Sequence, residues 1–205
     1  MVTLDEARHR IQTPDRTLLG QAQARLDRLT KPPGSLGRLE ELAAWYVMLT
    51  GEVKPDLPRA AVYTFAADHG IAQEGVSAYP HEVTAQMVLN FLRGGAGVNV
   101  LAQHVGAEVR IVDIGVASEL PVLAGLIHRK IGRGTKNFLR EPAMTRKQAV
   151  TAIETGIALA TEAAKEGIGL LGTGDMGIGN TTPSAAITAV MTGGPVQAVT
   201  GRGTG

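Results

Sequence analysis

A glycine-rich segment in the last third of the chain has the residue types needed to bind a phosphate group. Residues 172–183 read Gly-Thr-Gly-Asp-Met-Gly-Ile-Gly-Asn-Thr-Thr-Pro. Glycines allow several backbone N–H groups to converge on one point, and Thr182 with Pro183 is a suitable N-cap and first residue for a following helix. The start of a helix adds unpaired N–H groups and a partial positive charge, which attract an anion. The segment therefore predicts a phosphate-binding loop, and a glycine-rich turn needed only for packing is the alternative.

Three aspartates each stand at the end of a short apolar run. They are Asp68, Asp113 and Asp175. In open α/β sheets, ligands bind beyond the carboxyl ends of the strands. Aspartate is also a common turn and capping residue, and each of the three taken alone is better explained in that way. We nevertheless expect at least one of these carboxylates to serve a ligand.

Other residues near this predicted site give weaker signals. Gly201 and Gly203 follow an expected strand beginning at Val196, so their N–H groups could form a second side of the phosphate loop, although a plain turn fits equally well. His69 and His81 lie nearest the site, and their spacing matches no standard metal cluster. His69 beside Asp68 could be a base with its orienting carboxylate, but a structural turn pair is the favoured interpretation.

A basic stretch over residues 128–147 contains seven cationic side chains and one acid, Glu141. Such a stretch could attract an anionic substrate, but a solvated surface is the more common use and is favoured here. The cations are Arg129, Lys130, Arg133, Lys136, Arg140, Arg146 and Lys147.

The same glycine segment also fits a dinucleotide-binding pattern. Gly172, Gly174 and Gly177 match G-x-G-x-x-G, which is weak support when it stands alone. No Asp or Glu follows Asp175, so the acid that normally holds the ribose is missing. An NAD(P)-binding oxidoreductase is therefore the alternative enzyme, and a non-catalytic nucleotide-binding module is the alternative of another class. No Walker A sequence is present.

The elements that must position these residues alternate between strand and helix after Pro58. Apolar runs over 60–67, 109–112 and 168–171 predict buried strands, with helices between them. This alternation predicts an α/β fold, a Rossmann-like parallel sheet flanked by helices. Residues 58–205 are expected to form this nucleotide-binding domain. We expect it to be incomplete at its C-terminus, because a glycine-rich loop directly after a strand is an unusual end for a domain.

The first 57 residues predict a smaller helical domain or arm. Thr3 and Glu6 have the capping-box pattern, and Asp15 can cap a second helix. The Lys-Pro-Pro-Gly sequence beginning at Lys31 ends that helix, and a third helix follows Ser35.

Composition excludes several classes of protein. The 205 residues are 44% hydrophobic and 19% charged with a formal net charge of +1, which gives no general attraction to nucleic acid. The absence of cysteine excludes disulfides, thiolate nucleophiles and cysteine-ligated metals. No apolar run reaches the roughly 18 residues needed to cross a bilayer, and the N-terminus lacks the apolar core of a signal peptide. We therefore expect a cytoplasmic protein with neither membrane nor nucleic-acid partners.

Several separated motifs resemble those of the nicotinate-nucleotide:dimethylbenzimidazole phosphoribosyltransferases. They are Lys31–Glu40, Ala67–Gly70, Tyr79-Pro80 with Val83-Thr84, and Gly174–Pro183, in the same order over essentially the whole chain. The resemblance implies transfer of phosphoribose from nicotinate mononucleotide to 5,6-dimethylbenzimidazole, giving α-ribazole 5′-phosphate and nicotinate for the lower ligand of cobalamin. It further implies a homodimer and no metal ion or other cofactor.

The resemblance also implies roles for individual residues. Asp175, where some relatives carry glutamate, has an auxiliary role in positioning ribose or base, and Tyr79 and Met87 fall where relatives line the azole pocket. The family's general-base glutamate and a phosphate-binding lysine lie beyond residue 205, so we expect these 205 residues alone to be inactive. The residues assigned to phosphate and ribose are Gly174, Gly177, Ile178, Gly179, Asn180, Thr181, Thr182, Gly201 and Gly203.

Overall fold

The computed structural model describes residues 2–204, which divide into two compact units. One unit spans Asp5–Pro58, and the other comprises the rest of the described chain. The sequence placed the boundary after residue 57; the observed division follows Pro58, and the residues before Asp5 go with the larger unit. Each unit is described by itself.

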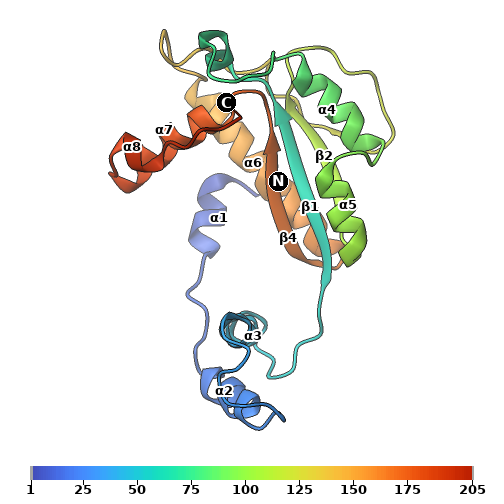
Figure 1. Cartoon of the computed structure of the whole chain (residues 1–205), viewed down its shortest axis with the longest axis vertical. Helices are drawn as coiled ribbons and strands as arrows, with labels where there is room; N and C mark the ends of the chain where they lie inside the picture. Colours follow the sequence, from blue (N-terminus) through green and yellow to red (C-terminus); the bar gives the residue numbers. More distant parts are fainter. Residues whose placement is uncertain (1, 205) are drawn as a thin grey trace. The chain divides into compact units, whose positions relative to one another are not determined.

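The larger unit contains a four-stranded sheet in the order β3-β2-β1-β4. All three strand pairings are parallel, which confirms the predicted α/β fold with a parallel sheet flanked by helices. The chain passes from β1 to β2 and β3 on one side, then returns to place β4 on the other side of β1 (Figure 1). The strands are β1 (Arg59–Ala67), β2 (Glu108–Gly115), β3 (Leu126–His128) and β4 (Ile168–Met176).

Helices connect the strands and cover both faces of the sheet. Ile111 on β2 belongs to a core cluster with Val88 and Phe91 of α4, whereas the adjacent Val112 packs with Leu159 of α6. Successive side chains of a strand point to opposite faces, so α4 and α6 lie on opposite sides. The helices of this unit are η1 (Gly70–Glu74), α4 (Val83–Leu92), α5 (Gly97–Val105), α6 (Arg146–Lys165), α7 (Thr181–Thr192) and α8 (Val196–Val199).

Three predictions about these elements were wrong. The strand expected over 168–171 continues to Met176, because Gly172 and the residues after it pair with Val62 and its neighbours on β1. The strand expected at Val196 is the short helix α8, since a run of four residues is too short for periodicity to separate the two structures. Strand β3 was missed because its three residues carry no recognisable pattern.

The smaller unit contains most of α1 (Leu4–Arg10) together with α2 (Leu19–Asp27) and α3 (Arg38–Thr50). Lys31, between α2 and α3, donates to the carboxylate of Glu40 at 2.7 Å, and the N–H of Leu36 donates to the same oxygen at 3.1 Å. Glu40 is buried, and these two donors hold its pKa below the usual value. The first and last residues of the Lys31–Glu40 motif therefore fold this segment onto itself.

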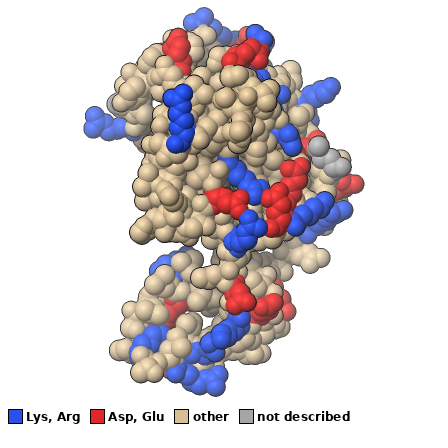
Figure 2. All heavy atoms as spheres, turned by 90° about the vertical axis from the view of Figure 1, so that its right-hand side faces the viewer, with Lys and Arg blue, Asp and Glu red and all other residues tan. Residues whose placement is uncertain are grey.

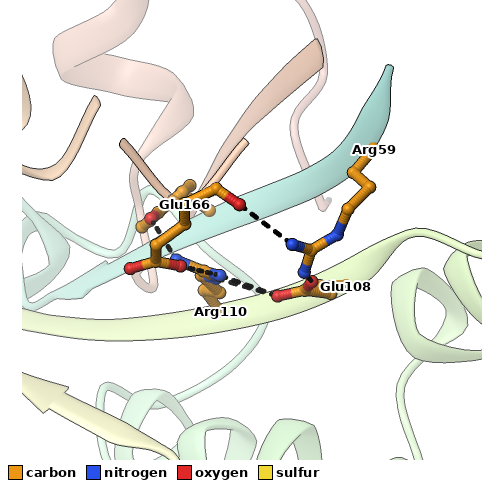
Figure 3. A network of polar contacts seen from close by, with 5 residues as sticks. Arg59, Glu108, Arg110 and Glu166 are labelled. Atoms are coloured by element: carbon orange, nitrogen blue, oxygen red, sulfur yellow. Dashed lines mark hydrogen bonds and ion pairs between the residues drawn. The ribbon is translucent and has the colours of Figure 1, made fainter. Parts of the chain in front are cut away.

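A polar network joins the amino ends of β1 and β2 to the end of α6 (Figure 3). Arg110 contacts Glu108 at 2.7 Å and Glu166 at 2.6 Å and donates to the hydroxyl of Tyr63 at 2.9 Å. Arg59 pairs with Glu108 and donates to the backbone oxygen of Glu166. These groups lie at the opposite end of the strands from the glycine segment, so the network stabilises the sheet and has no place in the site.

None of the described helices combines the length and the apolar character required to cross a membrane.

Candidate functional site

The glycine segment lies where the strand order of the sheet reverses. β1 and β4 are neighbours, and the connection after β1 leads to the other side of the sheet from β4. Ligands of open α/β sheets bind at such a switch point, outside the carboxyl ends of the strands. The loop from Gly177 to Asn180 leaves β4 at this point and leads into α7 (Figure 1).

Close contacts fix the shape of this loop. A Cβ on Gly177 would lie 2.1 Å from the oxygen of Ala67 and 2.8 Å from Nε2 of His69, so only glycine fits there. Gly179 has a φ of 81°, in the left-handed region that favours glycine. The N–H of Ile178 donates to Oγ1 of Thr84 at 3.1 Å within the core. Ile178 was assigned to phosphate binding, but its N–H is already used inside the protein.

Helix α7 begins at Thr181, which corrects the prediction that Thr182 is its N-cap and Pro183 its first residue. Asn180 occupies the N-cap position, and its side chain donates to Oδ2 of Asp175 at 2.6 Å rather than capping the helix. Pro183 is tolerated in the first turn because the N–H that proline lacks has no helical partner there. The twelve-residue helix therefore directs its positive end at the loop.

The three strand-end aspartates have different environments. Asp113 is fully buried, accepts the N–H of Val116 at 2.9 Å and pairs with Lys130 at 3.3 Å. Asp68 is also buried and accepts the N–H of Ala117 at 2.7 Å. Asp175 is exposed at the loop. Of the three, Asp175 alone is exposed to solvent.

The segment from Arg129 to Asn137 covers the carboxyl ends of β2 and β1. The N–H of Arg129 donates to Asp113 O, and the N–H of Thr135 donates to Asp68 O at 3.0 Å. Gly70 lies so close to this segment that a Cβ would be 2.5 Å from the backbone nitrogen of Asn137. The position of the segment from Arg129 to Asn137 explains why Asp68 and Asp113 are buried. It leaves the carboxyl end of β4, next to β1, for a ligand.

Carboxylates, four of them from outside the stretch, pair with most of the cations of the basic stretch. Five of its seven cations have acidic partners, which supports the prediction of a charged surface rather than an anion-attracting patch. Figure 2 likewise shows positive and negative side chains interspersed on the face that it draws. The pairs are Arg129–Glu162, Lys130–Asp113, Arg133–Glu119, Lys136–Glu141 and Arg140–Glu74.

His69 lies against the loop but is not arranged as a base with an orienting carboxylate. Burial lowers the pKa of its imidazole, and the charges of Asp175 and Asp68 oppose this effect only in part. The Asp68 oxygen that makes a hydrogen bond is used by the backbone of Ala117. The close approach of this ring to Gly177 fits the structural interpretation of the histidine.

The remaining predicted site residues approach the loop to different degrees. A Cβ on Gly203 would lie 2.8 Å from Oγ1 of Thr181, so Gly203 lies beside the start of α7, whereas Gly201 has no such neighbour within 4 Å. They follow α8 and not the expected strand. Thr204 shares a hydrogen bond of 2.9 Å with Ser77, which in turn accepts the N–H of Tyr79. Tyr79 is thereby placed near the same region and is 56% exposed.

Met87 lies on α4, one turn after Thr84, and packs against the same apolar cluster as Met176 of β4. Sequence reasoning placed Met87 in the azole pocket but assigned no role to Thr84 or Ser77. A single threonine or serine has no distinctive signature, so neither contact was predictable. Over the described chain, no group of three or more His, Asp or Glu could hold a metal ion.

The dinucleotide pattern does not form its usual structure. Gly172 and Gly174 lie inside β4, paired with Val62 and Thr64, whereas the fingerprint requires its first glycines in the turn after a strand. What the fold and the loop define is an α/β protein with a candidate anion-binding loop at a sheet switch point.

Comparison with known proteins gives the family. A family model described as phosphoribosyltransferase matches residues 11–205, and the chain belongs to that family. It is 63% identical over all 205 residues to the nicotinate-nucleotide–dimethylbenzimidazole phosphoribosyltransferase of Geobacter sulfurreducens and 57% identical to that of Roseiflexus castenholzii, covering 58% of each. The crystal structure of CobT from Thermus thermophilus superposes with a TM-score of 0.88 at 54% identity, covering 92% of this chain and 56% of that one. The chain thus spans little more than half the length of these relatives.

Proposed function

We propose that this chain supplies the mononucleotide-binding part of a nicotinate-nucleotide:dimethylbenzimidazole phosphoribosyltransferase. The observation that carries the proposal is the loop from Gly177 to Asn180, held at the switch point with the positive end of α7 behind it. The relatives from Geobacter sulfurreducens and Roseiflexus castenholzii are named for this activity, which supports the proposal. The substrates would be nicotinate mononucleotide and 5,6-dimethylbenzimidazole, and the products α-ribazole 5′-phosphate and nicotinate.

Catalysis of the proposed reaction mainly requires that the two reactants be aligned. A nitrogen of the azole attacks C1′ of the ribose from the face opposite nicotinate, the bond from C1′ to the nicotinate nitrogen breaks, and the azole proton is removed. The ring of the mononucleotide is positively charged, so nicotinate is already a good leaving group. Fixing the phosphate and ribose therefore supplies much of the rate enhancement, because it converts an encounter of two molecules into a reaction within one site.

The described residues divide this work between them. The start of α7 at Thr181 would bind the phosphate, with Gly203 beside it. Asp175, held by Asn180, would position the ribose or the base. Tyr79 and Met87 would border the azole. The general base and a phosphate-binding lysine would come from the part of the relatives that this chain does not span, and a cytoplasmic homodimer completes the proposal.

A pair of titrations tests the phosphate assignment directly. The chain would be titrated calorimetrically with nicotinate mononucleotide and with the corresponding ribonucleoside, which lacks the phosphate, both in EDTA. We expect the mononucleotide to bind at least about tenfold more tightly, a difference of ~1.4 kcal/mol. Equal affinities would show that the loop does not recognise phosphate and would remove the main support for the proposal.

A further inference from the structure

The contact between Thr84 and the glycine loop is buried and specific. The side chain of Thr84 is fully buried, and Ile178, whose N–H it accepts at 3.1 Å, is 6% exposed. A backbone N–H buried without an acceptor is strongly disfavoured, because it has given up its hydrogen bond to water. The hydroxyl of Thr84 therefore constrains where the residue between Gly177 and Gly179 can lie.

The same helix turn carries the residue expected at the azole. Thr84 and Met87 are three residues apart on α4, so they are neighbours on the helix surface. Met87 packs against the apolar cluster that also contacts Met176, and Met176 immediately precedes Gly177. Helix α4 thus contacts the end of β4 through an apolar cluster and the loop through one hydrogen bond.

We propose that Thr84 is a positioning residue through which α4 fixes the position of the glycine loop. It thereby keeps the residues that bind the azole aligned with those that bind the phosphate. This inference rests on the proposed function. Its physical basis is the steep dependence of bimolecular reactions on alignment, since displacement of one reactant by about 1 Å costs on the order of 100-fold in rate. Thr84 contacts the loop and not the substrate, so its effect on a ligand passes entirely through Ile178.

Three variants separate positioning from general stability. Thr84→Val is nearly isosteric and removes the acceptor, whereas Thr84→Ser keeps the hydroxyl. Val88→Ala is the matched control, because Val88 is fully buried one turn further along α4, and no polar contact links it to the loop among the described residues. For each variant we would measure the melting temperature, the affinity for nicotinate mononucleotide and the hydrogen exchange of the amides from Gly177 to Thr182.

The expected result is a split between affinity and stability. Thr84→Val should weaken mononucleotide binding at least about tenfold and accelerate hydrogen exchange at the amide of Ile178. Thr84→Ser should keep an affinity for the mononucleotide within about threefold of that of the unchanged chain. Val88→Ala should keep an affinity for the mononucleotide within about threefold of that of the unchanged chain, even if its melting temperature falls as far as that of Thr84→Val. Unchanged affinity in Thr84→Val, or equal losses in Thr84→Val and Val88→Ala, would overturn the inference.

Hydrogen exchange keeps this test distinct from that of the proposed function. If the unchanged chain binds no nicotinate mononucleotide, the proposed function fails, and the loop amides then decide the role of Thr84 alone. Faster exchange throughout the loop in Thr84→Val but not in Val88→Ala would support positioning. The same exchange in both variants would contradict it.

Discussion

Among the described glycines, Gly177 is the one at which an added Cβ would meet the closest neighbour. That neighbour is the backbone oxygen of Ala67, and the ring of His69 is next. Gly174, three residues earlier in β4, has much more space, because its added Cβ would meet nothing closer than the hydroxyl of Thr64 at 3.9 Å. The two glycines look equivalent in the sequence, and only the packing of β1 against β4 separates them.

We expect Gly177→Ala to lower the free energy of unfolding by about 2 kcal/mol or more, because the backbone must move to admit the methyl group. Gly174→Ala is the control and should change it by less than about 0.5 kcal/mol. Urea denaturation of both variants checks this prediction. Equal losses of unfolding free energy in the two variants would mean that Ala67 and His69 leave room for a methyl group at Gly177.

His69 gives the fold a pH dependence of predictable sign. Burial lowers the pKa of its imidazole in the folded state below the ordinary value of 6.5. The unfolded chain therefore binds a proton more readily, and stability is complete above pH 6.5 and falls as the pH drops below it. The slope for one proton is at most about 1.4 kcal/mol per pH unit.

The prediction for His69→Gln is a smaller loss of stability between pH 7.5 and 5.5 than in the unchanged chain. Urea denaturation at both pH values provides the measurement, and His81→Gln is the control, since His81 is exposed. A pH dependence that survives in His69→Gln would assign the effect to another group.

Among the elements, those with strong local signals were predicted and those defined by tertiary pairing were not. Thr145 and Gln148 have the sequence pattern of a capping box and form one at the start of α6. The N–H of Gln148 donates to Thr145 at 3.2 Å, and the N–H of Thr145 donates to Gln148 at 2.9 Å. The alternation of strands and helices was equally readable. The length of β4 was not, because glycines weaken a strand pattern and only pairing with β1 extends it to Met176.

Removal of this cap should have a modest and local effect. Thr145→Ala is expected to lower the free energy of unfolding by about 1 kcal/mol, because the N–H of Gln148 loses its acceptor. Thr151→Ala, on an exposed turn of the same helix, is the control for loss of a threonine side chain. Chemical denaturation would contradict the assignment if the two variants behaved alike.

On the scale of the whole molecule, the candidate site was predictable as a segment but not as a selection of residues. Local composition predicts a phosphate loop within residues 172–183, and the structure narrows the loop itself to the residues between the end of β4 and the start of α7. Which aspartate remains accessible depends on the segment from Arg129 to Asn137, which buries Asp68 and Asp113 and leaves Asp175 open. That segment reads as a basic loop in the sequence, and nothing in its composition shows that it lies across two strand ends.

The 205-residue chain should bind a substrate without turning it over. We expect no α-ribazole 5′-phosphate from this chain supplied with nicotinate mononucleotide and 5,6-dimethylbenzimidazole, because the proposed general base is not among its residues. Mass spectrometry of the products checks this, with the Geobacter sulfurreducens relative as positive control. Measurable turnover by the chain alone would place the base within these 205 residues, where Asp175 is the candidate.

The most direct measurement is a crystal structure of this chain with nicotinate mononucleotide bound. The account predicts the phosphate at the start of α7, within hydrogen-bond distance of the N–H of Thr181, with the ribose beside Asp175. A phosphate bound instead at Arg146 and Lys147, two cations of the basic stretch, would contradict it. The loop from Gly177 to Asn180 would then be a packing turn and not part of a substrate site.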